Sequence, residues 1–450
     1  MGATPAVAVT MVAGARTAVR PVDGELAGWN PVLLAGVVGR EVLERAGLDA
    51  GVLDEVVVGC CDPVGAAGAD VARAIVLAAG WPVSIGGSVV DRGETSGAAA
   101  AQAAVAAIRA GQARTVLVVG LGLCSVVPPG AAALNRAYGA PWGGVAERFD
   151  EVGGLLPAPR LSERAAQAAG IGRAELDAAA EESRRRRAEA WSLSAAGPGS
   201  GSGSESRPAT GSRPAAGAGS AAGAGSGSRA AIVAVAARPG AAAGRGVYRG
   251  DPVADDVVRD WGDAADLPPA FDDDGLLTAA TFAPPADCVT AVLLQAGEAP
   301  APGGVAGTGQ ACDPFDPVGN VAAAVGRAPG GMATVAGMGR AAGDPFDPVG
   351  NVAVAVGRAL GDAGVELSAV DVISVVEHDA ATTMLLARSL DIDAERINRD
   401  GGAVATGNAG AAEELRLITD GLAVPASERL LLTISAGPTG SAVILWSTEI

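Results

Sequence analysis

The sequence predicts an α/β fold built from small side chains. Hydrophobic residues make up 49% of the chain but aromatic residues only 3%, and 66 glycines are present. This composition favours closely packed helices and strands. Short apolar runs alternate with segments of helical spacing, as in a parallel sheet covered on both faces. With 450 residues, the chain has room for two or three domains or one large duplicated core.

The first predicted strand lies in "AVAVTMVAGARTAV" at residues 6–19. Apolar residues then recur at helical spacing over residues 30–48, and we expect this helix to end at Gly47. The remaining elements of this part are expected in a regular order, with a strand at 53–61, a helix at 69–81, a strand at 86–92, an alanine-rich helix ending near Gly111 and a strand at 113–123.

The middle of the chain changes character and predicts a loop and helical domain at residues 126–250. It begins as a loop and continues into a helix-turn-helix pair over 161–191. Residues 197–228 are Gly, Ser and Ala with no apolar periodicity, which predicts a flexible linker. Arg184–Arg187 follow acidic residues and are expected on a solvated helix face, with an anion contact as the alternative.

The second half resembles the first in plan, so we expect one half over residues 1–297 and another over 298–450. "DPFDPVGN" occurs twice, from Asp313 and from Asp344. Two copies are too few for a solenoid, so we interpret them as a local duplication. The second copy leads into a helix of the fold, and the first is an insertion. Strand, helix and Gly-rich turns then alternate to the end of the chain.

Charge and cysteine usage narrow the classes of function. A formal net charge of −18 argues against a nucleic-acid surface, which needs clustered basic residues. The five cysteines form no CxxC pair and lie near no histidine, so we expect neither a metal site nor a disulfide framework. No apolar run is long enough to span a membrane. A cytoplasmic location without membrane or nucleic-acid partners is therefore expected.

Four polar residues follow predicted strands at turns and could meet in one crevice. Glu94 lies in "VVDRGETSG" where a helix begins, so it is either a helix-start carboxylate or a reagent. His378 is the only histidine and directly follows an apolar strand. Asn408 lies in a Gly-rich loop that opens a helix, a shape that can bind a carbonyl group. Ser435 ends another strand.

The order of these motifs resembles the thiolase family over nearly all of the chain. The matching segments include "GARTAVR", "VLERAGLDAGVLDEVVVGC", "TSGAAAAQAAVAAIRAGQARTVLVVG", "LSERAAQAAGIGRAELDAAAEESRRR" and "NRDGGAVATGNAG". This resemblance implies the thiolase fold, in which two duplicated βαβαβαββ halves pack as a five-layer α-β-α-β-α sandwich with a loop and helical insertion domain.

The resemblance also implies that the catalytic positions have changed. Glu94 stands where thiolases carry the nucleophilic cysteine, and Ser435 where they carry a second, acid/base cysteine. His378 stands at a position that is usually Asn, and Asn408 replaces the histidine of the family's Gly-His-Pro. The His378 and Asn408 pair is similar to that of ketoacyl synthase III-like condensing enzymes.

Three functions agree with this pattern. A carboxylate is a poor nucleophile towards a thioester, so Glu94 is expected to act as a base with His378 and Asn408. This gives an acyltransferase that makes or breaks a C–C bond in an acyl-CoA or carrier-protein thioester, with no tightly bound cofactor. The alternatives are an inactive partner of a cysteine-containing thiolase and a plain acyl-CoA-binding remnant.

The resemblance implies two further properties of the chain. It places contacts to coenzyme A at Thr278, Ala279 and Phe282, where Phe282 replaces the small polar residue that is usual in the family. It also implies a homodimer, or a heterodimer with a thiolase paralogue.

Overall fold

The computed structural model describes most of the predicted core of the chain. The described residues are 7–134, 139, 143–152, 154, 156–196, 235–236, 252–253, 255–297, 332–422, 429–437 and 439–448. The predicted linker at 197–228, the DPFDPVGN copy that starts at Asp313 and Cys312 lie outside the described residues.

The N-terminal half contributes five strands in the order β4-β3-β5-β8-β1. Strand β3 pairs in parallel with β4 and β5, but β8 runs antiparallel to both of its neighbours, β5 and β1. The parallel pairing expected for the first part of the chain is present among β3, β4 and β5, whereas β8 enters the sheet from the opposite end. The bounds are β1 Val9–Arg16, β3 Glu55–Cys60, β4 Gly86–Val90, β5 Thr115–Leu123 and β8 Ala286–Ala296.

The C-terminal half repeats this strand order. Its strands run β10-β11-β12-β9, and Ile397 bridges to Ile373 of β10 at the place that β4 occupies beside β3. The two halves join where β1 pairs with β9, and the short β2 (Arg20–Pro21) pairs with β8. The bounds are β9 Met332–Ala342, β10 Val372–Val376, β11 Arg429–Ser435 and β12 Thr439–Thr448. The shared order confirms two duplicated halves.

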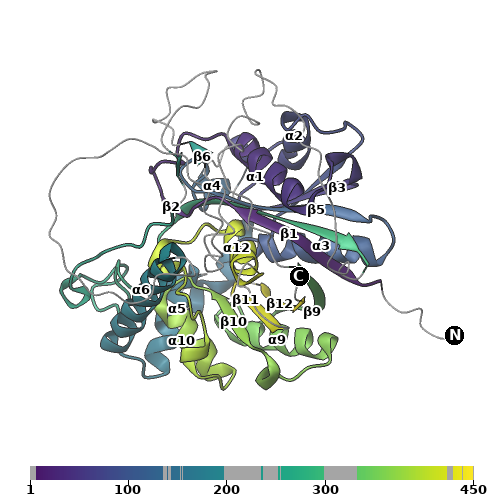
Figure 1. Ribbon diagram of the computed structural model, residues 1–450. Coiled ribbons are helices and arrows are strands. Elements are labelled where there is room, and N and C mark those ends of the chain that lie inside the picture. Colours follow the sequence, from purple (N-terminus) through teal and green to yellow (C-terminus); the bar gives the residue numbers. More distant parts are fainter. Residues whose placement is uncertain are drawn as a thin grey trace.

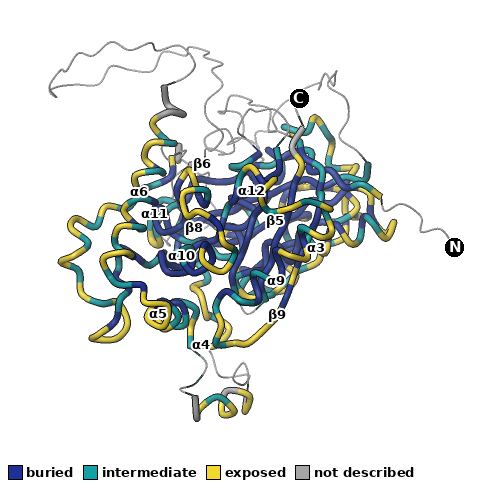
Figure 2. Tube along the Cα trace, turned by 90° about the horizontal axis from the view of Figure 1, so that it is seen from below, coloured by how far each residue is buried: buried dark blue, intermediate teal, exposed yellow. Residues whose placement is uncertain are grey.

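The helices complete five layers (Figure 1). Helices α1 (Pro31–Ala46) and α2 (Val71–Ala78) cover the outer face of the N-terminal strands. Helices α3 (Ser96–Arg109) and α12 (Ala411–Leu422) share one core with strands of both halves. Helices α9 (Gly350–Ala363) and α10 (Ala380–Ser389) cover the remaining face. The expected α-β-α-β-α sandwich is confirmed, and its buried interior runs through the centre of the molecule (Figure 2).

Small residues allow the central layer to pack closely. A Cβ atom on Gly97 of α3 would overlap the carbonyl oxygen of Ala411, and one on Gly122 of β5 would overlap that of Ala409. Both contacts place the start of α12 directly against the N-terminal half. Close backbone approach of this kind requires glycine, which explains part of the glycine-rich, aromatic-poor composition.

The inserted segment contains the expected helix-turn-helix pair, formed by α5 (Ala158–Ala168) and α6 (Arg173–Ala196). The shorter helices are α4 Ala131–Leu134, α11 Ala403–Thr406 and the 3-10 turns η1 Ala50–Val52, η2 Gly65–Ala67, η4 Gly143–Val152, η5 Ala264–Asp266, η6 Leu367–Ala369 and η7 Ala394–Arg396. Strands β6 (Val235–Ala236) and β7 (Pro252–Val253) form a separate small ladder.

The prediction that Arg184–Arg187 form a solvated helix face is wrong for two of the four residues. Arg184 is buried and donates to the Ala280 carbonyl oxygen at 2.8 Å. Arg187 is buried against the carboxylate of Asp256. Arg185 and Arg186 pair with acidic residues of their own helix. Helix α6 therefore docks one basic face on the protein, because buried carboxylates and carbonyls there offer partners to the guanidinium groups.

Candidate active site

Glu94 lies in the turn between β4 and α3 and does not cap the helix. The N–H of Ala98 in the first turn of α3 donates to the carboxylate of Glu414, which comes from α12. Thr95 stands at the N-cap without a side-chain cap bond. The Glu94 carboxylate instead reaches His378, with 3.3 Å between Oε2 and Nε2. The carboxylate at the start of α3 is therefore that of Glu414. Glu94 does not have this role, which was one of its two interpretations from the sequence.

His378 follows β10 and brings a buried imidazole to the same place. Its side chain is 5% exposed, whereas that of Glu94 is 46% exposed. Nε2 lies 2.9 Å from the carbonyl oxygen of Ala436, and Nδ1 lies 3.3 Å from Nδ2 of Asn408. Because Nε2 faces two acceptors and Nδ1 faces a donor, these contacts favour the tautomer with its proton on Nε2.

The charge balance around His378 favours protonation. Burial opposes the positive charge, but the Glu94 carboxylate, the Ala436 carbonyl and the carboxylates of Asp379 and Glu414 outweigh it. The pKa of His378 is therefore raised above its ordinary value. The largest contribution that favours the charged imidazole comes from the Glu94 carboxylate.

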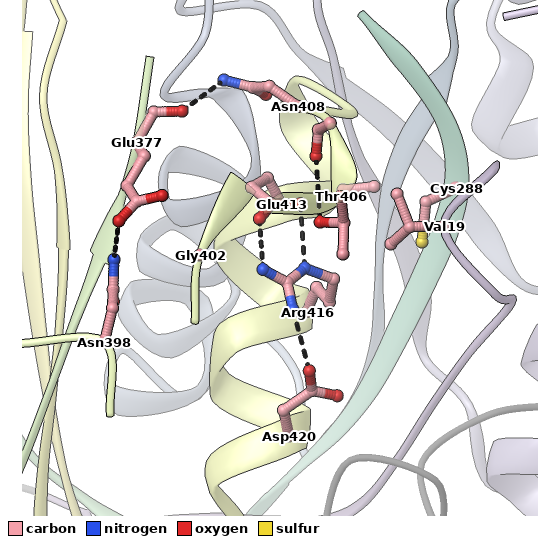
Figure 3. A network of polar contacts seen from close by, with 12 residues as sticks. Val19, Cys288, Glu377, Asn398, Gly402, Thr406, Asn408, Glu413, Arg416 and Asp420 are labelled. Carbon is pink, nitrogen blue, oxygen red and sulfur yellow. Dashed lines mark hydrogen bonds and ion pairs between the residues drawn. The ribbon is translucent and has the colours of Figure 1, made fainter. Parts of the chain in front are cut away.

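Asn408 fixes the imidazole from behind through its Nδ2, and Figure 3 shows the same amide nitrogen directed at Glu377. Its Oδ1 accepts the N–H of Gly410 at 2.8 Å, and its Nδ2 donates to the carbonyl oxygen of Glu377 at 3.3 Å. The Glu377 carboxylate is itself held by Asn398 and by the N–H of Val404. Both sides of the Asn408 amide are thus engaged within the protein, so Asn408 orients His378.

Ser435 lies apart from the other three residues. It is 2% exposed at the end of β11, where its backbone pairs with Val376 and Ser441. Its hydroxyl has no hydrogen-bond partner among the described residues, and it lies near Glu414, whose pKa is raised to about 7 by burial. Ser435 does not line the cavity that holds Glu94, His378 and Asn408.

The segment expected to contact coenzyme A reaches the cavity at one residue. Phe282 lines the wall and packs edge-to-face on Phe271, with ring centroids 5.8 Å apart. Thr278 is fully buried, with its hydroxyl accepting the N–H of Ala280, and Ala279 is not part of the wall. The N–H of Ala283 donates to the carbonyl oxygen of His378 at 2.9 Å, which ties this segment to the site.

A cavity of about 670 Å³ is lined by Glu94, His378, Asn408 and Phe282. Its wall also includes Cys61, a residue that was not identified from the sequence as part of the site. Its thiol donates to the carbonyl oxygen of Gly93 at 2.9 Å. Burial and the Glu94 carboxylate raise the pKa of this thiol well above its usual range, so it remains a donor. Cys61 follows β3, so the rule that sites gather at strand ends could have identified it.

The described ranges contain no cluster of potential metal ligands and no membrane-spanning helix. Within them, no group of three or more His, Cys, Asp or Glu side chains could hold a metal ion. No helix in the part of the chain that the structure describes is long and apolar enough to cross a membrane. The thiols of Cys60, Cys61, Cys124 and Cys288 are free.

Comparison with curated proteins finds partial similarity to CoA-dependent enzymes. The chain is 36% identical over 113 residues to the steroid 3-ketoacyl-CoA thiolase of Mycobacterium tuberculosis, covering 25% of this chain and 28% of that protein. It is 37% identical over 126 residues to an acetyl-CoA acetyltransferase of Pseudomonas aeruginosa, covering 27% and 32%. A β-ketoadipyl-CoA thiolase of the same species is 29% identical over 180 residues, covering 38% and 45%. The matched stretches thus span less than half of each relative.

Solved structures match the whole fold. Human mitochondrial 3-ketoacyl-CoA thiolase superposes with a TM-score of 0.71 at 20% identity, covering 98% of this chain and 99% of that one. Acat5 thiolase from Ascaris suum, solved in complex with coenzyme A, gives 0.71 at 21% identity and covers 98% and 100%. Residues 9–195 match the family model for the thiolase N-terminal domain, and residues 330–442 match that for the thiolase C-terminal domain. With both domain models matched in order, the chain belongs to the thiolase family.

Proposed function

We propose that the protein is a thiolase-type acyltransferase acting on an acyl-CoA thioester, with Glu94 as its base. The observation that carries this proposal is the contact between Glu94 Oε2 and His378 Nε2 at 3.3 Å in the cavity wall. A general base has to lie within hydrogen-bonding reach of a reacting group and of its partner acid. Glu94 is half-exposed towards the cavity, whereas His378 is held rigidly behind it.

The proposed step is proton abstraction next to the thioester carbonyl. The C–H bond at the α carbon breaks, its proton passes to the Glu94 carboxylate, and the electron pair moves onto the thioester oxygen as an enolate. The Nε2–H of His378 then donates to this oxygen. The enolate carbon then attacks the carbonyl carbon of a second acyl-CoA, the C–S bond of that thioester breaks, and the leaving CoA thiolate takes the proton from Glu94. In the reverse direction, the thiolate of free CoA attacks the 3-oxo carbonyl carbon, the C–C bond breaks, and the enolate is protonated by Glu94.

Each supporting residue has a distinct part in this scheme. The raised pKa of His378 keeps its Nε2–H a strong donor for a developing negative charge. Asn408 holds the ring from Nδ1 and acts through His378. Ser435 is behind the site with Glu414 and is given no role in contact with substrate.

Coenzyme A is the carrier that the names of the relatives give, which favours it over a carrier protein. These names differ in the acyl group, so they do not identify the acyl group that this protein binds.

We propose a dimer because β4 ends the strand order, pairs only with β3 among the described strands, and exposes Gly86 and Ser88. A second chain could extend this edge.

The test is turnover of a 3-oxoacyl-CoA by the isolated protein and its Glu94→Gln variant. The carboxamide keeps the size of the side chain but does not accept the proton, so turnover should fall by roughly 10² to 10⁴-fold. Glu366→Gln, at an exposed carboxylate outside the cavity, is the matched control and should be unchanged. Equal turnover by Glu94→Gln and the wild type, with the fold intact by circular dichroism, would exclude the base role.

A second candidate is an inactive partner subunit of a cysteine-containing thiolase. It is favoured by the position of Glu94, which the resemblance places where the nucleophilic cysteine is expected. In this case the isolated protein should not turn over any 3-oxoacyl-CoA, and activity should appear only after mixing with the cysteine-containing chain. Glu94→Gln should then leave the activity of the mixture intact.

A further inference from the structure

The charged residues of the cavity wall indicate which kind of acyl group the protein binds. The family assignment does not determine this group. Three carboxylates line the wall, from Asp62, Asp91 and Glu94. Among the described residues of the wall no arginine is present, and the chain contains no lysine. Apart from His378, the described residues of the wall therefore offer no cation to a negatively charged substrate group.

Backbone hydrogen bonds fix two of these carboxylates. The Asp62 carboxylate accepts the N–H groups of Gly130 at 2.7 Å and Ala132 at 3.0 Å, which holds the loop that forms one side of the cavity. The Asp91 carboxylate accepts the N–H of Gly93 at 2.9 Å. Neither carboxylate has an ion-pair partner among the described residues, so both add negative charge to the cavity.

Three thiols in the wall respond to this negative charge. Burial, Asp91 and Asp62 raise the pKa of Cys60 to about 12. Burial, Asp287 and Asp62 raise the pKa of Cys124 to about 12. Cys61 is raised further by burial and by Glu94. All three remain protonated at neutral pH and behave as small uncharged surfaces.

The rest of the wall is mostly apolar. It combines aromatic and branched side chains with prolines, including Leu121, Leu123, Val127, Pro129, Phe271 and Phe282. Such a surface favours ligand groups that lose no hydrogen bonds when they leave water.

We infer that this cavity selects acyl groups with an apolar, uncharged end and excludes acyl groups that end in a carboxylate. The inference rests on the proposed function, because it names the substrate class of the same site. Two like charges about 8 Å apart at an effective dielectric constant of 20 repel strongly enough to weaken binding about 30-fold. With only His378 to offset three carboxylates, a substrate carboxylate should meet such repulsion.

The test compares two thioesters of equal length on the full chain. Octanoyl-CoA and its octanedioyl-CoA analogue share the carrier and chain length, and differ by one terminal carboxylate. Neither carries a 3-oxo group, so C–C cleavage cannot occur during calorimetric titration, and any condensation would appear as free CoA in the titrated sample. We expect octanoyl-CoA to bind at least ten-fold more tightly than octanedioyl-CoA at pH 7.

Variants then locate the source of the selectivity. Asp62→Asn keeps the size of the side chain and one acceptor for the loop, and it should improve octanedioyl-CoA binding several-fold with little effect on octanoyl-CoA. Asp91→Asn provides a second route if Asp62→Asn unfolds the loop. Glu366→Gln, on the exposed surface, should leave the ratio of the two affinities unchanged.

The outcomes separate the two proposals. Equal or tighter binding of octanedioyl-CoA would overturn the inference about the acyl group while leaving the acyl-CoA function in place. Selectivity that survives both Asp62→Asn and Asp91→Asn would also overturn it, since the carboxylates would not be its cause. If neither thioester binds, the proposed function itself fails.

Discussion

The N-terminal and C-terminal halves place matching backbone around different chemistry. Helix α1 ends at Gly47 and α9 at Gly364, both in the left-handed conformation. The same number of residues later, Asp54 and Asp371 directly precede the next strands, β3 and β10, and each N–H donates to a carbonyl oxygen of the neighbouring strand at 3.0 Å. Each carboxylate also accepts a neighbouring N–H, from Thr115 in one half and Leu430 in the other.

This register makes Cys61 the counterpart of His378. Counting from Asp54 and Asp371, the two residues stand at equivalent positions past the ends of β3 and β10, and both line the same cavity. The central helices differ in the same way. After Gly97, α3 continues with alanines, whereas after Gly410, α12 continues to Glu413 and Glu414.

The difference teaches that duplication preserved the parts that set the backbone and changed those that meet the cavity. Glycine caps and strand-start aspartates satisfy backbone N–H and C=O groups in both halves. Side chains just past the strand ends do not have to satisfy these backbone groups and can differ between the halves. One half has the thiol of Cys61 at this position, and the other has the imidazole of His378. The four experiments below test this division.

The largest expected effect separates His378 from Cys61. His378→Ala should lower turnover of a 3-oxoacyl-CoA by roughly 10² to 10⁴-fold, because the donor beside Glu94 is lost. Cys61→Ser keeps a donor for the Gly93 carbonyl and should cost less than about ten-fold. An equally large loss in Cys61→Ser would show that both halves supply reacting groups. Steady-state kinetics with matched circular dichroism spectra provide the measurement.

The next effect tests a buried charge cluster of the N-terminal half that also reaches α12 of the C-terminal half. Asp256 joins Arg16 of β1 at 2.9 Å and also meets Arg187, while Arg16 reaches Asp420 of α12 at 2.7 Å. Asp256→Ala leaves buried guanidinium groups without this partner and should destabilise the protein by about 3–5 kcal/mol in chemical denaturation. Asp272→Ala, which breaks an exposed pair with Arg160, should cost at most about 1 kcal/mol. Similar losses in both variants would contradict a structural role for the buried cluster.

A smaller effect, on the pH dependence of stability, follows from Glu414. This carboxylate lies at the start of α12, where the matching helix α3 carries alanines. Burial raises its pKa to about 7, so the folded state binds an extra proton between the unfolded and folded pKa values. Stability is therefore greatest below about pH 4.5 for this group and falls as pH rises through about 7, by up to about 3 kcal/mol. Glu414→Gln should remove this decline in urea midpoints measured from pH 5 to 8. A decline unchanged in the variant would assign it to another group.

The smallest effect is on the ionisation of His378. It is the only histidine, so its NMR resonances are unambiguous. Glu94→Gln removes the carboxylate and should lower the pKa of His378. Because the folded pKa is raised, His378 contributes stability below its unfolded pKa that is lost as pH rises through the folded value, and this contribution should shrink in the variant. Glu366→Gln should leave the titration curve in place, and an equal shift there would point to a general surface-charge effect.

Much of the fold could be predicted from local pattern. Helix α1, its stop at Gly47 and strands β3, β4 and β5 follow from apolar spacing and capping residues. The direction of β8 could not, because pairing direction depends on which end of the sheet a distant segment enters. The burial of Arg184 and Arg187 was missed for a related reason, since their partners Ala280 and Asp256 lie far away in sequence.

For the site, the sequence by itself determined which polar residues follow strands, because strand ends and turns are set by neighbouring residues. The tertiary structure alone decided which of them meet. It brought Glu94 to His378, placed Asn408 behind the imidazole, buried Ser435 beside Glu414 and opened Cys61 to the cavity. Those outcomes depend on contacts between the two halves, and such contacts fix burial and charge partners that local sequence does not encode.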